Sequence, residues 1–178
     1  MRRPAALALL LVLVLVGGSC GGDSSKSAST TKYVPLDGSA RHPDAQGVVT
    51  KVAKDFSTLE LDGHRYSVAK DVQCFATQDG ATLPLLQRVG SYVQVGLKGS
   101  KVVWLANIAN VVRRAGQTDV VYYSGTVIDV ADGSMIFRDG TVLPIVSSLH
   151  LPRPPKKGAL VTVTIDPKRH AAVKVEDG

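Results

Sequence analysis

The chain has 178 residues, of which 44% are hydrophobic, 20% charged and 5% aromatic, and its 21 basic and 15 acidic side chains give a formal net charge of +6. This length allows one ordinary domain or two very small ones. The composition excludes a collagen-like chain, a disulfide scaffold and a chain that is disordered throughout.

The N-terminal residues are typical of an exported protein. Arg2 and Arg3 precede a run of twelve apolar residues, 5–16, and three small residues follow at 17–19. A basic start, an apolar stretch of this length and a small-residue exit are the features of a secretory signal peptide. The run is too short for a transmembrane helix, which takes about 20 apolar residues. We therefore expect residues 1–19 to be a cleaved signal peptide.

Cys20 stands directly after the small residues, and Ser19 precedes it. This arrangement resembles the lipobox of bacterial lipoproteins, although Gly17 stands where that family prefers an aliphatic residue. The resemblance implies that Cys20 is acylated, becomes the first residue of the mature chain and holds the protein at the outer side of the cell membrane. The alternative is ordinary secretion, with Cys20 left as a free thiol.

Charge and composition along the mature chain indicate a tether followed by a folded region. The mature chain carries 19 basic and 15 acidic residues, a net charge of +4 that is spread thinly, so we expect no nucleic-acid binding. Residues 20–46 begin with the lipidated Cys20, are rich in small and polar side chains and lack an apolar period. They are predicted to form a disordered tether.

From Gly47 onward, short valine-rich runs alternate with polar residues and are separated by turn glycines, a pattern that predicts β-strands and hairpins. Three blocks recur in the same order, which indicates an internal repeat. The matched blocks are 47–52 with 125–130, Asp62-Gly63 with Asp139-Gly140, and 90–97 with 158–165. We therefore predict one unit at 47–112, a linker at 113–118 and a second unit at 119–178.

Alternation within the repeated blocks predicts which side chains are buried. Val93, Val95 and Leu97 are expected to face inward, and Tyr92, Gln94 and Lys98 outward. In the second unit, Val161, Val163 and Ile165 take the inward positions. A sheet of about five short strands must curl to bury one face and remove its edges. The predicted fold is therefore all-β, with two tandem five-stranded barrels of OB-like or SH3-like type.

The two units differ between their third and fourth strands. Residues 83–89 are apolar enough for a short helix after Pro84, whereas prolines make 151–157 an extended loop. The whole pattern resembles the uncharacterised exported bacterial domains that occur as tandem G-x-V … D-G … G-x-x-V-x-V repeats behind lipoprotein signals. That resemblance implies an OB-like fold and no particular catalytic residue or ligand.

Motifs for catalysis and metal binding are absent from the sequence. It lacks the nucleophile elbow, the phosphate-binding loop and the paired metal-ligand motifs, so we expect no enzyme, cofactor or metal. A metal site formed by Asp62, His64 and Asp71 is the alternative to solvated turn residues, and we favour solvated turn residues. Cys74 is interpreted as a small buried hydrophobe, with a disulfide or redox role as the alternative.

Two groups of side chains are candidates for interaction. Trp104 is expected to point out of the first barrel and to pack the two repeats together, with partner or ligand binding as the alternative. The other repeat-packing candidates are Val111, Val112, Tyr122 and Tyr123.

Arg153, Lys156 and Lys157, joined by Arg169, form a predicted cationic lobe for an anionic partner, with a solvated loop as the alternative. The leading hypothesis is a non-catalytic interaction module for an envelope protein or anionic polymer. A small-ligand or metal-binding accessory lipoprotein, with its site at a barrel mouth or at the Asp62–His64 turn, is the alternative.

Overall fold

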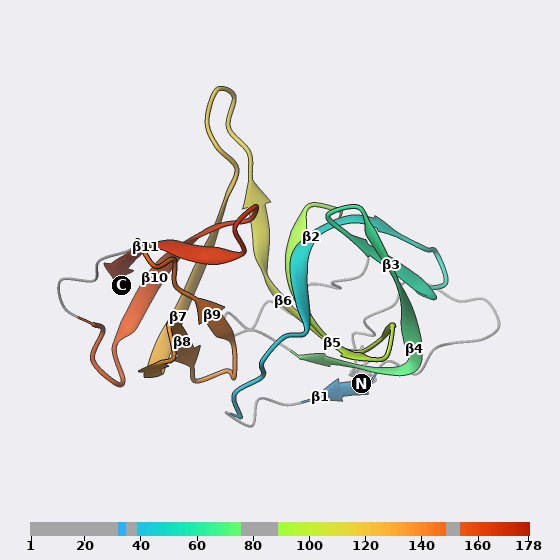
Figure 1. The fold of residues 1–178 in the computed structure, drawn as a ribbon, viewed down its shortest axis with the longest axis horizontal. Coiled ribbons are helices and arrows are strands. Elements are labelled where there is room, and N and C mark those ends of the chain that lie inside the picture. The colour runs from blue at the N-terminus through green and yellow to red at the C-terminus, as the bar shows by residue number, and fades with distance from the viewer. Residues whose placement is uncertain (1–31, 35–38, 76–88, 149–153) are drawn as a thin grey trace, which may run out of the picture.

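A computed structural model describes residues 32–34, 39–75, 89–148 and 154–178 (Figure 1). These parts of the chain are all-β, which confirms the predicted fold class. None of their segments forms a helix with the length and apolar character needed to cross a bilayer. The signal peptide, Cys20, the helix expected after Pro84 and Arg153 lie outside the described residues.

Five strands form the first barrel, in which both edges of the sheet meet. Antiparallel pairs join β2 to β3, β3 to β4, β2 to β5 and β5 to β6. A parallel pairing of β4 with β6 then closes the ring. The strands are β2 (Ala45–Val52), β3 (Thr58–Leu61), β4 (His64–Phe75), β5 (Ser91–Lys98) and β6 (Lys101–Val112).

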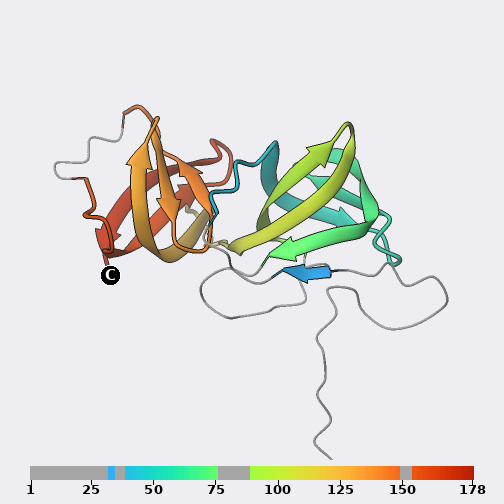
Figure 2. The same ribbon diagram turned by 90° about the horizontal axis from the view of Figure 1, so that it is seen from below.

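The second barrel uses the same pairing order. Antiparallel pairs join β7 to β8, β8 to β9, β7 to β10 and β10 to β11. A parallel bridge from Ile145, just after β9, to Ala172 on β11 takes the place of the closing β4–β6 pair. The strands are β7 (Val120–Ala131), β8 (Ser134–Phe137), β9 (Val142–Pro144), β10 (Leu160–Asp166) and β11 (Ala171–Asp177). The two barrels lie side by side in Figure 2.

Each barrel has a hydrophobic core, and Tyr92 and Ile108 from β5 and β6 of the first barrel extend the core of the second. Val93 and Val95 are at most 1% exposed in the first core and Leu97 packs against it, as the alternation predicts. Val161, Val163 and Ile165 are fully buried in the second core, again as predicted. Full burial of such a side chain stabilises the fold by roughly 1.5–3 kcal/mol.

The outward positions of β5 have an environment that alternation alone does not predict. Tyr92 and Gln94 point away from the first core, yet they are only 0% and 1% exposed. Tyr92 packs into the second core, and the Gln94 amide reaches the Val142 carbonyl of the second barrel. Polar outward positions on one strand therefore form the junction between the barrels.

The repeated Asp-Gly pairs lie at corresponding turns. Asp62 and Gly63 join β3 to β4 with left-handed φ values of 47° and 86°, as expected for a tight hairpin turn of the I′ type. Asp139 and Gly140 lie between β8 and β9, and Gly140 also has a positive φ of 83°. Each pair thus lies between the second and third strands of its barrel.

The predicted linker 113–118 lies in a projecting hairpin. β6 and β7 pair only through Val111–Val121 and Val112–Val120, so residues 113–119 extend beyond this short ladder. Figure 1 shows this hairpin arm extending away from both barrels. Within the arm, Arg113 Nε lies 3.4 Å from Asp119 Oδ2, and both side chains are exposed.

The prediction of a disordered tether through residue 46 is wrong for the part that the structure describes. β1 (Lys32–Val34) pairs in parallel with the end of β4. Residues 39–46, which we call the strap, lie between the two barrels (Figure 2). Backbone hydrogen bonds and an arginine–aromatic contact hold the strap. Because these contacts need no alternating apolar residues, the sequence pattern does not reveal that the strap is ordered.

Candidate functional site: the junction between the barrels

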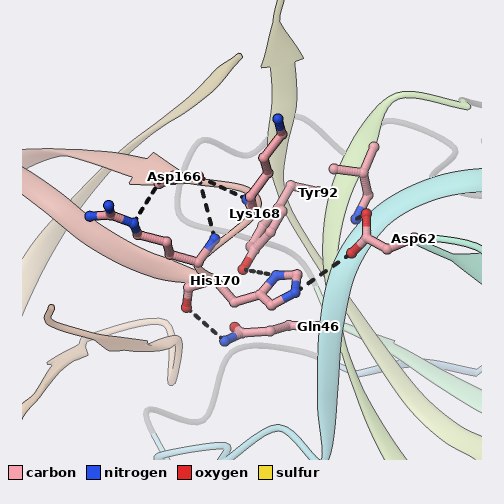
Figure 3. A network of polar contacts seen from close by, with 8 residues as sticks. Gln46, Asp62, Tyr92, Asp166, Lys168 and His170 are labelled. Carbon is pink, nitrogen blue, oxygen red and sulfur yellow. Dashed lines mark hydrogen bonds and ion pairs between the residues drawn. The ribbon is translucent and has the colours of Figure 1, made fainter. Parts of the chain in front are cut away.

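Polar side chains converge where the β10–β11 turn of the second barrel meets the first barrel (Figure 3). His170 comes from this turn, Asp62 from the β3–β4 turn, Tyr92 from β5 and Gln46 from β2. These four residues are far apart in the sequence, and only the packing of the barrels brings them together. We define them as the junction cluster.

The local fold of the β10–β11 turn positions His170. Asp166 Oδ1 accepts hydrogen bonds from the backbone N–H groups of Lys168, at 2.8 Å, and Arg169, at 3.3 Å. An aspartate that caps its own turn in this way is a common device for tight connections. His170 then takes a left-handed φ of 53° before β11 begins. Figure 3 shows the His170 ring directed toward Tyr92 and Asp62.

His170 contacts the first barrel through three of its atoms. Its Nδ1 lies 3.4 Å from the Tyr92 hydroxyl, and its Nε2 lies 3.7 Å from Asp62 Oδ2. Its backbone carbonyl accepts a hydrogen bond of 2.9 Å from Gln46 Nε2. The side chains of His170 and Asp62 are 35% and 38% exposed, so their contact is accessible to solvent.

Tyr92 is the most deeply buried member of the junction cluster. Burial raises the pKa of its phenol far above the usual range, and the negative charges of Asp62 and Asp166 raise it further. The hydroxyl therefore remains protonated at physiological pH. Tyr92 thus acts in the junction as a neutral hydrogen-bonding group rather than as a base or nucleophile.

Two glutamines extend the polar contacts along the junction. Gln94 Nε2 donates to the Val142 carbonyl at 2.7 Å and to Gln46 Oε1 at 3.0 Å. Gln46 in turn donates to the His170 carbonyl. Buried polar groups are costly unless they are hydrogen-bonded. This series of hydrogen bonds therefore fixes the orientation of one barrel relative to the other.

A cleft of about 410 Å³ opens beside the junction cluster. Its walls come from the strap, the β3–β4 hairpin and the β10–β11 turn. The lining residues are Pro43, Asp44, Ala45, Gln46, Leu61, Asp62, His64, Tyr66 and His170. This volume lies within the roughly 300–1,000 Å³ typical of small-molecule sites, which often lie between domains.

The structure does not bring together Asp62, His64 and Asp71, the three residues considered as metal ligands. Asp62 and His64 line the cleft, but Asp71 does not, and Asp62 contacts His170 instead. In the described parts of the chain, no group of three histidine, cysteine or acidic side chains is arranged to hold a metal ion.

A second polar cluster lies where the strap meets the second barrel. Asp139 is fully buried, and it accepts hydrogen bonds from the Tyr123 hydroxyl at 2.6 Å and from the Thr141 backbone N–H at 2.9 Å. The Arg41 guanidinium donates to the Asp139 backbone carbonyl. The same guanidinium stacks 4.1 Å from the centre of the Phe75 ring in the first barrel.

Trp104 packs on the first barrel and not between the two barrels, which corrects the prediction. Its ring meets Phe75 edge to face, with centroids 6.0 Å apart, and covers Gly96 on the neighbouring strand. Both contacts are within the first barrel. Gly96 on β5 pairs directly with Trp104 on β6, and because glycine has no side chain the Trp104 ring can lie over it. Of the other residues predicted to join the repeats, Val111 on β6 packs against the second core. Tyr123 belongs to the second barrel's own core, and Tyr122 is 44% exposed.

The predicted cationic lobe is only partly brought together. Lys156 and Lys157 are exposed in the loop before β10. Arg169 lies at the opposite end of β10, where its Nε is 3.6 Å from Asp166 Oδ2, so it does not belong to the lobe. Cys74 is buried, 1% exposed, in agreement with the interpretation as a small buried hydrophobe.

Sequence reasoning missed the residues that build the junction, above all His170, Tyr92, Gln94 and Arg41. The contacting residues are far apart in the sequence: Tyr92 and His170 are separated by 78 residues, and Arg41 and Asp139 by 98. The one available signal was the outward Tyr92 and Gln94, because a large aromatic beside a glutamine on an outward face indicates an interface. Comparisons with protein-family models, curated proteins and solved structures find no match for this chain.

Proposed function

We propose that the protein is a non-catalytic interaction module of the bacterial cell envelope. In this proposal a lipid on Cys20 holds it at the extracytoplasmic surface of the cell membrane. In this proposal the two barrels are tandem OB-like copies. Their strand order supports this, because the third strand of each barrel lies beside its fifth in parallel. The partner is an envelope protein or an anionic polymer.

The observation that carries the proposal is the buried junction. Tyr92 and Gln94 are almost completely shielded from solvent between two separately cored barrels. Their contacts hold the barrels in one arrangement, so loops on both are presented with fixed spacing. A preorganised surface lowers the entropy cost of binding, which suits a recognition module. The titratable groups of the junction are engaged in contacts between the barrels.

The loop before β10 offers the cationic contact. Lys156 and Lys157 are both exposed there, beside Pro154 and Pro155, which restrict the loop backbone. A phosphate-rich polymer bound by these lysines would release counterions, so its binding would weaken steeply as salt rises.

A polymer of glycerol phosphate units is a suitable probe for this contact. We expect the Lys156→Gln/Lys157→Gln double variant to bind it more weakly and with a shallower salt dependence than the wild type. Lys98 and Lys101, an exposed pair at the β5–β6 turn, provide the matched control as Lys98→Gln/Lys101→Gln. Equal losses in the two double variants would contradict specific binding through the loop.

The anchor is tested separately in cells. Mass spectrometry of the mature protein should find an acylated Cys20 at its N-terminus, and Cys20→Ala should move the protein from the membrane fraction to the soluble fraction. An unmodified Cys20, or cleavage at another position, would contradict the anchored assignment. Secretion without a lipid is then the remaining interpretation.

A second candidate function is a small-ligand accessory protein. The observation that favours it is the junction cleft, where the Asp62–His64 turn of the first barrel faces His170 of the second. A ligand that binds only the folded state must raise the melting temperature. A small molecule that raises the melting temperature of the wild type in a thermal-shift screen should no longer raise it in Asp62→Asn. A screen in which no compound raises the melting temperature would count against this candidate.

A further inference from the structure

The strap, residues 39–46, makes contacts with both barrels. On the second barrel, the Arg41 backbone N–H donates to the Gly140 carbonyl at 2.8 Å, and Arg41 bridges to Thr141 in parallel register. On the first barrel, the Asp44 N–H donates to the Val95 carbonyl at 3.0 Å, and Asp44 Oδ2 accepts from the Leu97 N–H at 2.7 Å. Four residues of chain therefore cross from one barrel to the other.

The Arg41 side chain contacts both barrels. Its guanidinium donates to the Asp139 carbonyl of the second barrel while its face lies 4.1 Å from the Phe75 ring of the first. An arginine–aromatic contact is stronger when it is desolvated, and the guanidinium hydrogen bond adds to it. One side chain thus links the two barrels at a point separate from the junction cluster.

The strap also forms one wall of the cleft. Pro43, Asp44, Ala45 and Gln46 all line it, together with His64 and His170. The Gln46 side chain accepts from Gln94 and donates to the His170 carbonyl, so the end of the strap is part of the junction cluster. Displacement of the strap would therefore open the cleft and loosen the junction together.

We propose that the strap is a conformational lock: when Arg41 is docked the two barrels form one rigid body with a closed cleft wall, and when it is released the barrels reorient. The lock does not depend on the proposed lipid on Cys20.

The lock is tested with Arg41→Ala in the full-length mature chain. Nitrogen-15 relaxation should give one common rotational correlation time for both barrels of the wild type. In Arg41→Ala the two barrels should show separate, shorter times, and the amides of Asp44 and Leu97 should exchange faster with solvent. Arg114→Ala, an exposed arginine in the hairpin arm, is the matched control and should behave as wild type.

Arg41→Lys distinguishes the guanidinium from its charge. Lysine keeps the positive charge but lacks the planar donor fork, so its correlation times should lie between those of the wild type and Arg41→Ala. Unchanged correlation times and exchange rates in Arg41→Ala would overturn the lock. Loss of the β-sheet circular dichroism signal in Arg41→Ala would also overturn it, because a lock between separately cored barrels leaves each core folded. Neither result bears on whether Cys20 carries a lipid.

Discussion

Tyr123 on β7 provides a quantitative test of the buried polar cluster in the second barrel. Its hydroxyl donates to Asp139 Oδ2 at 2.6 Å, and both residues are at most 1% exposed. Its ring packs edge to face on Phe137, with centroids 4.8 Å apart. The change Tyr123→Phe removes the hydroxyl and keeps the ring, so the lost hydrogen bond dominates the change in stability.

The expected cost of Tyr123→Phe follows from the chemistry of the acceptor. A hydrogen bond to a charged group contributes about 1.5–3 kcal/mol, and here the acceptor is a fully buried carboxylate. With a urea dependence of about 1–3 kcal/mol per molar for small proteins, the midpoint should fall by roughly 1 M. The loss should appear in the unfolding transition of the second barrel.

The neighbouring Tyr122 is the matched control. It is 44% exposed on the same strand, so Tyr122→Phe should change the free energy of unfolding by no more than about 0.5 kcal/mol. A double-mutant cycle with Asp139→Asn then isolates the pair, since coupling between contacting residues shows as non-additivity. If Tyr123→Phe were no more destabilising than Tyr122→Phe, the reasoning about this buried hydrogen bond would be refuted.

Three further perturbations test other contacts. In Gly96→Ala the new methyl group meets the Trp104 ring, so we expect a loss of about 1–3 kcal/mol and a shifted emission of this single tryptophan; unchanged emission would argue against the packing. Tyr92 has a raised pKa because of burial and two neighbouring carboxylates, so its contribution is complete below about pH 10, where unfolded tyrosine ionises, and declines above it. Wild type should therefore lose stability relative to Tyr92→Phe above about pH 10, by at most about 1.4 kcal/mol per pH unit, and parallel urea-stability curves would contradict the shift. Gln94→Ala removes the donor to the Val142 carbonyl, so the free energy of unfolding measured in urea should fall by about 1–3 kcal/mol. This loss should exceed that caused by a glutamine-to-alanine change at an exposed position.

The strand pattern was predictable because its signals are local. Alternation at Val93 and Val95, and at Val161 and Val163, directly gives the buried face of each strand. The Asp62-Gly63 pair predicts a tight hairpin, since glycine adopts a positive φ at little cost. These features need only neighbours in the sequence.

The junction was not predictable, because its contacts join distant residues. Gln46 and His170 are 124 residues apart, and neither stands in a motif. The strap was interpreted as disordered because its composition is polar, yet Arg41 is held by Phe75 and by backbone carbonyls of the second barrel. Trp104 was assigned to the junction from its outward position, although Gly96 makes room for it on the first barrel.

The central claim is that two separately cored barrels are held as one body by the strap and the junction cluster. Residual dipolar couplings of backbone amides in the wild-type chain test it most directly. The account predicts that couplings from β2–β6 and from β7–β11 fit a single alignment tensor with the two barrels oriented as in Figure 2. Two different tensors, each fitting only one barrel, would contradict it.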